Sequence, residues 1–278
     1  MALLALEGVS KAFAGVQAVR DVSFVVPAGG ILGVMGPNGS GKTTLFNLIA
    51  GALRPDRGRI RLRERDVTGL APHRMCAHGV ARTFQHVRPF PGLSVRDNVL
   101  VGLFYGRSWG RSWGRSWGRS WGHRWTWRRA ERDPERDPER AVARLLAVVG
   151  LSAKAHLRAA RLSLLERRWL ELARALATGP DLLLLDEFMA GLTPAETAAA
   201  MTVIRRVHAE GTTLMLVEHI VWALLDLSDR IVVLSAGEKI AEGPPGVIAT
   251  DPAVVDAYLG VGGEAERAGP AGGRARGA

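Results

Sequence analysis

A glycine-rich segment that ends in lysine and threonine carries the most specific chemical signal in the chain. Residues 36–43 read Gly-Pro-Asn-Gly-Ser-Gly-Lys-Thr and fit the pattern G-x-x-x-x-G-K-[ST]. Glycines in this pattern let consecutive backbone N–H groups surround phosphate oxygens, and the following helix N-terminus adds partial positive charge. The pattern predicts a phosphate-binding loop, whose candidate binding residues are Gly36, Asn38, Gly39, Ser40, Gly41, Lys42, Thr43 and Thr44.

Two residues of this loop have separate predicted tasks. We expect Lys42 to contact the β- and γ-phosphates of a nucleotide and Thr43 to hold Mg²⁺. The alternative is a glycine turn that contains a lysine by chance. A strand pattern at 31–35 precedes the loop and a helix pattern at 44–49 follows it, and this context favours the phosphate-binding interpretation.

A second chemical signal is a pair of acids after a short apolar run. Residues 182–185 are four leucines, and Asp186 and Glu187 follow them directly. Asp186 is placed to reach a Mg²⁺ ion, and Glu187 is placed to orient and deprotonate an attacking water. Buried strands often end in surface acids, so this pair gains its meaning from the phosphate-binding loop, and together the two signals predict nucleotide hydrolysis.

The segments around these motifs alternate between strand-like and helix-like patterns. This alternation predicts an α/β fold with a mainly parallel sheet, on which ligands bind at the carboxyl ends of the strands. Ser163 with Glu166, and Thr193 with Glu196, have the spacing of capping boxes and predict helix starts. The predicted strands are 22–26, 31–35, 182–185 and 212–217, with a hairpin at 231–241 and short strands and turns at 58–84; the predicted helices are 44–49, 94–104, 139–149, 163–178 and 194–210.

Composition narrows the class of protein. The 278 residues are 47% hydrophobic, enough for a sizeable core, and the apolar runs are too short to cross a bilayer. One cysteine, Cys76, fits a reducing compartment, and the N-terminus lacks the basic region of a signal peptide. We therefore expect a cytoplasmic protein.

A repetitive segment accounts for much of the net charge of +10. Residues 107–140 contain ten arginines and five acids, a local balance of +5, so the excess charge need not form a folded nucleic-acid-binding face. Gly-Arg-Ser-Trp occurs four times between Gly106 and Trp121, and six of the eight tryptophans lie between Trp109 and Trp127. An expanded repeat tolerated in a surface loop is the favoured interpretation, and a Trp/Arg-rich partner-binding segment is the alternative. The Gly/Ala-rich end after 260 is predicted to be disordered.

With these motifs taken together, residues 3–260 resemble an ABC ATPase, and most closely the ATP-binding subunits of branched-chain amino acid transporters. The resemblance implies a P-loop NTPase core of the ABC type with an antiparallel β subdomain and a helical subdomain. It implies the following division: 1–85, β subdomain and first part of the core; 86–164, helical subdomain with the insertion 106–140; 165–260, second part of the core; 261–278, disordered tail.

The resemblance also assigns roles to single residues. Gln85, in Thr-Phe-Gln at 83–85, is the expected sensor of Mg²⁺ and the γ-phosphate. Phe13 is expected to stack on adenine, with a core phenylalanine as the alternative. His219, in Val-Glu-His at 217–219, is expected to hydrogen-bond the γ-phosphate, while a purely structural histidine is the alternative.

The chain departs from the family pattern in two places. The signature, usually LSGGQ, reads Leu-Ser-Leu-Leu-Glu at 162–166, so both glycines are missing while Ser163 remains able to face a phosphate. The alternative is that Ser163 and Glu166 only cap their helix. The second departure is Thr193, at a position where many relatives have aspartate. We interpret both as divergence within an active enzyme.

The resemblance implies an ATPase that is the ATP-binding subunit of an importer for branched-chain or other amino acids. Its expected ligands are ATP and Mg²⁺. Its expected partners are membrane permease subunits, which the segment 85–103 would face, a second ATP-binding subunit, and indirectly an extracytoplasmic substrate-binding protein. We expect no nucleic-acid partner, and a peripheral location on the inner face of the membrane. The alternatives are an ABC ATPase acting on nucleic acid or ribosomes, a P-loop kinase, and a module that holds ATP without hydrolysis.

Overall fold

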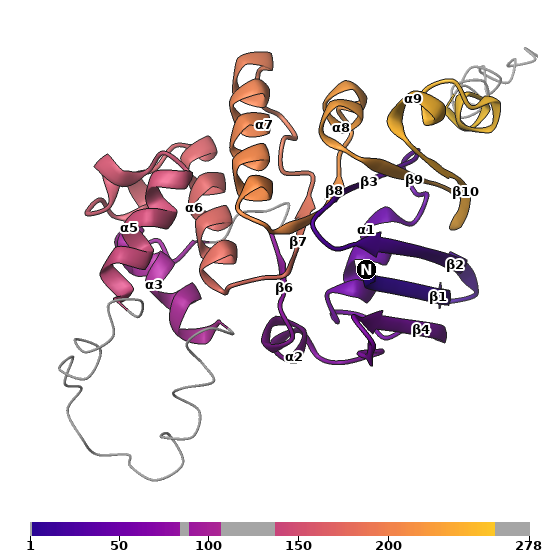
Figure 1. The fold of residues 1–278 in the computed structure, drawn as a ribbon, viewed down its shortest axis with the longest axis horizontal. Coiled ribbons are helices and arrows are strands. Elements are labelled where there is room, and N and C mark those ends of the chain that lie inside the picture. Colours follow the sequence, from indigo (N-terminus) through magenta and orange to yellow (C-terminus); the bar gives the residue numbers. More distant parts are fainter. Residues whose placement is uncertain (1, 84–88, 107–136, 259–278) are drawn as a thin grey trace, which may run out of the picture.

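A computed structural model describes residues 2–83, 89–106 and 137–258 of the chain. A central sheet has helices on both faces, an antiparallel sheet lies below it, and a group of helices lies to one side (Figure 1). The strand order of the central sheet is β10-β9-β3-β8-β7-β6, parallel throughout except for β10. Its strands are β3 (Ile31–Met35), β6 (Val80–Arg82), β7 (Leu182–Asp186), β8 (Thr213–Val217), β9 (Arg230–Ser235) and β10 (Glu238–Gly243).

The antiparallel sheet has the order β2-β1-β4-β5 and supports the first helix from below. Helix α1 (Lys42–Ile49) lies between the two sheets and buries Phe46, Leu48 and Ile49. This second sheet consists of β1 (Ala2–Phe13), β2 (Val16–Pro27), β4 (Arg57–Leu62) and β5 (Arg65–Asp66).

Alternation along the central strands divides the core in two. Leu182 and Leu184 of β7 point toward α1 and the antiparallel sheet, while Leu183 and Leu185 point toward the helices on the other face. Successive side chains of a strand face opposite sides, so a strand buried on both faces needs apolar residues at every position. Besides α1, the labelled α-helices of the described residues are α2 (Pro72–Ala77), α3 (Val95–Tyr105), α5 (Pro138–Val148), α6 (Leu164–Ala177), α7 (Pro194–Ala209), α8 (Val221–Leu227) and α9 (Pro245–Ile248).

Both predicted capping boxes are present and fix where their helices begin. Ser163 Oγ accepts the Glu166 N–H, Glu166 accepts the Ser163 N–H, and Thr193 and Glu196 repeat the arrangement at α7. The predicted α/β class, the mainly parallel sheet and the 231–241 hairpin are likewise confirmed.

Other expectations differ from the structure. The region 58–84, predicted to hold strands and turns, also contains helix α2, which begins at a proline but has no side-chain cap. Helix α8 was not predicted either. Asp137 caps α5, so the first turn of that helix overlaps the end of the expected insertion 106–140. Residues 107–136 and the expected tail 261–278 lie outside the described residues, and the division of the chain into subdomains stays a prediction.

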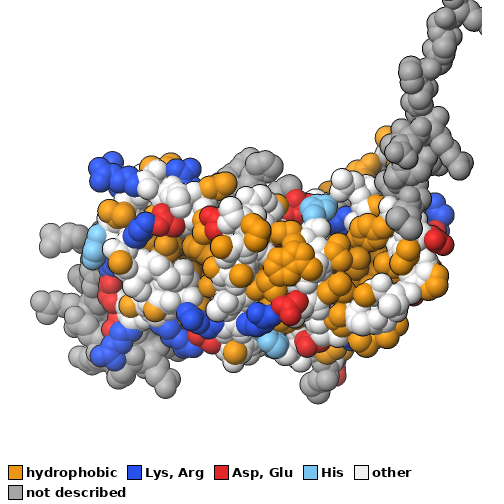
Figure 2. Space-filling view, turned by 90° about the horizontal axis from the view of Figure 1, so that it is seen from above, with side chains coloured by type: hydrophobic (Ala, Val, Ile, Leu, Met, Phe, Trp, Pro, Cys, Tyr) orange, Lys and Arg blue, Asp and Glu red, His pale blue; other side chains and the backbone are white. Residues whose placement is uncertain are grey.

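The helical face of the molecule carries exposed hydrophobic side chains. Figure 2 shows them gathered over the region of α8 and α9, and the exposed residues of these helices include Trp222 and Val247. Within the described ranges, no helix combines the length and the apolar composition needed to cross a membrane.

Replacement of Leu184 by alanine should destabilise the fold by about 2–5 kcal/mol, because the cavity would open between α1 and the sheet. Chemical denaturation would measure this loss. The matched control is Leu164→Ala, where the side chain is 63% exposed and the expected change is within about 0.5 kcal/mol. Equal effects of the two substitutions would contradict the described core.

Candidate functional site

The phosphate-binding loop joins β3 to α1 at the carboxyl end of the sheet. Two of its glycines leave no room for a side chain: a Cβ on Gly36 would lie 2.1 Å from the Leu234 carbonyl oxygen, and one on Gly41 would lie 2.3 Å from that of Ala18. Both also have positive φ, 147° and 101°, a region that glycine adopts without strain. The loop is therefore held against β9 and β2 in a shape that the sequence can reach only through glycine.

Lys42 lies under this loop with its ammonium group buried. Its Nζ donates to the carbonyl oxygens of Gly36 at 2.7 Å and Pro37 at 2.9 Å. Burial lowers the pKa of Lys42, while the carboxylates of Glu187 and Asp186 act in the opposite direction. The positive charge of Lys42 therefore lies at the base of the loop. An entering phosphate oxygen would replace one of the carbonyl oxygens as acceptor of the ammonium group.

A cavity of about 120 Å³ brings the loop together with residues from two other strands. Glu187 follows β7 and His219 follows shortly after β8, so the parallel register places both at the same edge of the sheet. The lining residues are Asn38, Gly39, Ser40, Gly41, Lys42, Thr43, Thr44, Glu187 and His219.

Glu187 and His219 form a hydrogen-bonded pair in this cavity. The distance from His219 Nε2 to Glu187 Oε1 is 2.8 Å, and the carboxylate can only accept, so Nε2 carries the proton when Glu187 is ionised. Glu187 has a positive φ of 49°, a conformation that costs a residue other than glycine about 1–3 kcal/mol and is concentrated at functional sites. Its N–H donates to the Val217 carbonyl oxygen at 2.8 Å, which ties the strained residue to β8.

Asp186 lies beside the cavity and belongs to a buried charge network. Arg82 donates to its carboxylate at 2.6 Å and to Asn47 Oδ1 at 2.6 Å. Asp186 and Thr43 line one groove, so a carboxylate and a hydroxyl, oxygen ligands that suit Mg²⁺, face the same space. In the part of the chain that the structure describes, no three His, Cys, Asp or Glu side chains form a metal cluster.

Three other predicted residues have different outcomes. Phe13 is 44% exposed at the end of β1, so the alternative of a core phenylalanine is wrong. Ser163 caps α6 and does not line the cavity around Lys42, so the capping role is confirmed and any phosphate contact stays a prediction. Gln85 lies outside the described residues.

Sequence reasoning missed Glu218, a buried acid next to His219. It is 3% exposed, and its Oε1 accepts the Met189 N–H at 2.9 Å. Burial raises its pKa to about 7; the charge of Glu187 adds to this, whereas the Met189 amide and Arg168 act in the opposite direction. The sequence shows an acid between the end of a buried strand and His219. It does not show that Glu218 is buried, because that burial depends on how the segment after Glu187 packs.

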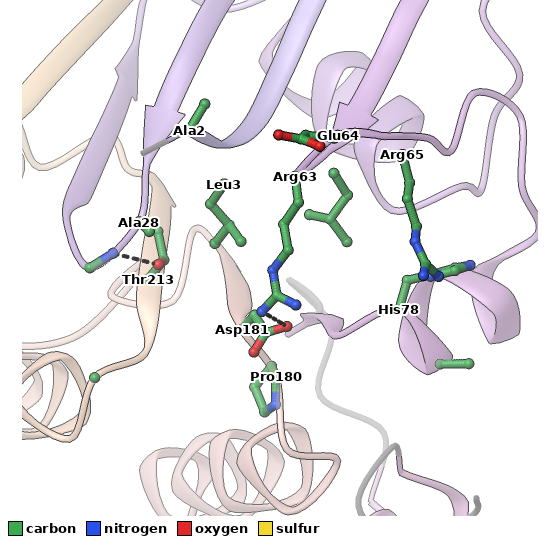
Figure 3. Close-up of a pocket in the computed structure, with 14 residues that line it drawn as sticks. Ala2, Leu3, Ala28, Arg63, Glu64, Arg65, His78, Pro180, Asp181 and Thr213 are labelled. Carbon is green, nitrogen blue, oxygen red and sulfur yellow. Dashed lines mark hydrogen bonds and ion pairs between the residues drawn. The ribbon is translucent and has the colours of Figure 1, made fainter.

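A second cavity lies at the opposite edge of the sheet, near the amino ends of the parallel strands (Figure 3). It has a volume of about 780 Å³ and is crossed by an ion pair of 2.8 Å between Arg63 and Asp181. None of the phosphate-loop residues, Glu187 or His219 lines it. Ligands of parallel sheets generally bind at the carboxyl ends of the strands, and the smaller cavity lies at that end.

Comparison with known proteins gives two matching families. A family model described as "ABC transporter" matches residues 19–190. A second model, described as "Branched-chain amino acid ATP-binding cassette transporter", matches residues 238–264.

Individual relatives match along almost the whole chain. The chain is 36% identical to the high-affinity branched-chain amino acid transport ATP-binding protein LivG of Salmonella typhimurium, covering 93% of this chain and 98% of the relative. It is 35% identical, with the same coverage, to the corresponding protein BraF of Pseudomonas aeruginosa.

Solved structures give the same result. A nucleotide-free ATP-binding cassette from an ABC transporter has a TM-score of 0.76 at 30% identity, with 93% of this chain and 99% of that chain covered. The ADP conformation of MJ1267, an ATP-binding cassette of an ABC transporter, has a TM-score of 0.77 at 29% identity, with 94% and 99% covered.

The raised pKa of Glu218 predicts how stability changes with pH. Its carboxyl is harder to ionise in the fold than in the unfolded chain, so the stability it contributes is present at low pH and is lost as pH rises toward 7. Glu218→Gln keeps a neutral acceptor for the Met189 N–H. Relative to the natural chain it should therefore gain stability between pH 5 and pH 8, by at most about 3 kcal/mol.

Denaturation curves of the natural chain and of Glu218→Gln across this pH range would measure the difference in their stability. The other titrating groups contribute equally to both proteins and cancel in this difference. A difference that stays constant with pH would contradict the assignment.

Proposed function

Because the chain belongs to the ABC transporter family of ATP-binding proteins, we propose that it hydrolyses ATP to drive an importer of branched-chain or other amino acids through a separate membrane permease. The observation that carries this proposal is the single cavity that joins the phosphate loop to Glu187 and His219. The family membership speaks against a P-loop kinase, and the transport names of the relatives favour transport over action on nucleic acid or ribosomes.

The phosphate loop would bind the triphosphate through its backbone. Amides of Asn38, Gly39, Ser40 and Gly41 would surround the phosphates, with the hydroxyl of Thr44 beside them. Gly36 would contribute the close turn that opens the loop, because its N–H already donates to the Tyr258 hydroxyl. Lys42 would move its ammonium from the two loop carbonyls to the β- and γ-phosphates. The exposed ring of Phe13 is available to stack on adenine.

The metal site is proposed from the donors that face one groove. Thr43 and Asp186 would hold Mg²⁺, together with Gln85, and the ion would neutralise charge on the phosphates. Arg82 donates to Asp186 and so keeps its carboxylate oriented toward this groove.

Glu187 would accept a proton from the attacking water, since its carboxylate reaches into the cavity beside the phosphate loop. His219 donates its Nε2 proton to that carboxylate and would turn this proton toward the γ-phosphate when ATP binds. Phosphoryl transfer depends mainly on position and charge, so two fixed side chains and a preformed loop are sufficient. The intact Glu187 argues against a module that only holds ATP.

The remaining elements would serve partners. A second ATP-binding subunit would place its signature over this phosphate loop, and Ser163 of this chain would serve the second subunit in return. The segment 85–103 would face the permease; the groove that Thr43 and Asp186 line has a volume of about 850 Å³ and continues past Val101 on α3 and Arg174 on α6. The permease and an extracytoplasmic binding protein would select the transported amino acid, and the chain would lie on the inner face of the membrane.

Two substitutions test the site. Lys42→Ala should lower ATP hydrolysis by at least about 100-fold, because it removes the charge nearest the phosphates. Glu187→Gln should stop hydrolysis while ATP still binds. Phosphate release and nucleotide binding measure the two effects, and Lys239→Ala is the control, since that lysine pairs with Glu242 and does not line the cavity around the phosphate loop. Normal turnover in either site variant would contradict the assigned role.

The altered signature predicts an asymmetric pair when the second subunit carries a regular signature. The site built on the phosphate loop of this chain would then be complete, and the opposite site would use the segment 162–166 without its glycines. Glu187→Gln in this chain should therefore reduce ATPase activity of the assembled transporter much more than the equivalent change in the second subunit. Equal losses would contradict the asymmetry.

A further inference from the structure

The last helical segment of the described chain reaches the phosphate loop. Strand β3 ends at Met35, which is paired with Val233, so the N–H of Gly36 is the first beyond this ladder. Its acceptor is the phenol oxygen of Tyr258, 222 residues further along the chain, at 2.9 Å. The carbonyl oxygen of the same glycine accepts from Lys42 Nζ at 2.7 Å.

Tyr258 is held in place by the residues before it. Asp251 accepts the N–H groups of Ala253 at 2.8 Å and Val254 at 3.3 Å, which starts the helical segment 252–258. Val254 is buried and belongs to the core cluster that also contains residues of β9 and α8. Because residues four apart share one face of a helix, the anchored Val254 directs Tyr258 toward the loop.

The hydroxyl is suited to act as an acceptor. Burial raises the pKa of Tyr258, and the Gly36 N–H acts in the opposite direction, so the phenol is neutral near pH 7. Gly36 is also packed against the Leu234 carbonyl oxygen, since a Cβ on this glycine would lie 2.1 Å from that atom. The hydrogen bond to Tyr258 and this close packing therefore both restrain Gly36, whose carbonyl oxygen Lys42 must leave when a phosphate binds.

We propose that Tyr258 is a positioning residue for nucleotide binding, and that the segment 252–258 braces the phosphate loop through the hydrogen bond to Gly36. This inference rests on the proposed ATP site. Without the hydroxyl, the Gly36 N–H loses its acceptor. Nucleotide binding would then have to order the amides of the phosphate loop, which lowers the affinity for the nucleotide. Glu187 and His219 are not touched, so the loss falls on affinity and leaves the chemical step unchanged.

The test is Tyr258→Phe in the full-length chain, which removes one oxygen and keeps the ring. We expect ATP to bind about three- to tenfold more weakly, as loss of one hydrogen bond implies, with KM raised to the same extent and kcat unchanged. Tyr105→Phe is the matched control, because that tyrosine is 79% exposed at the end of α3.

A thermal unfolding curve would show that the variant is folded, and amide hydrogen exchange of a peptide containing Gly36 supplies a readout independent of activity. Exchange there should be faster in Tyr258→Phe than in the natural chain. Wild-type affinity together with unchanged exchange would overturn the inference. Failure of the proposed function is distinguishable, because ATP would then fail to bind the natural chain and the Tyr105→Phe control as well.

Discussion

The parallel register of β3, β7 and β8 is the constraint on which the site depends. Val34 and Asp186 are both paired with Val217, so the three strands end at one level. Residues that follow these strands are far apart in sequence, yet the register places the loop carrying Lys42 next to Glu187 and His219. A shift of one strand by one residue would turn each of its side chains to the other face of the sheet and would separate these groups.

Burial of both sheet faces keeps that register in place. The leucines of β7 alternate between the core around α1 and the core beneath the other helices, so neither face tolerates a slip. The same packing sustains two conformations that are costly or sterically restricted: the left-handed Glu187 and the Gly36 loop pressed against Leu234. A preformed site of this kind lowers the ordering that a triphosphate must drive on binding.

Much of this site was accessible from the sequence because its signals are local. The phosphate loop, Asp186 and Glu187 each adjoin a recognisable strand, and both capping boxes span four residues. Glu218 and Tyr258 were not recognised, because their importance arises from contacts with Met189 and Gly36 that the chain forms only when folded. Helices α2 and α8 lack side-chain caps, which removes the signal that identified α6 and α7.

The signature segment begins helix α6 through the capping box of Ser163 and Glu166. The Ser163 hydroxyl oxygen accepts the Glu166 N–H at 3.3 Å, a long hydrogen bond, and the same side chain also interacts with the Glu166 carboxylate. Glu166 is also paired with Lys154, which holds the pKa of that carboxyl below its usual range. The cap therefore keeps Ser163 exposed at a positive helix end, while Leu164, in place of a glycine, adds an apolar side chain where a second subunit's triphosphate would approach. The loss of both glycines is what distinguishes this segment from the family signature.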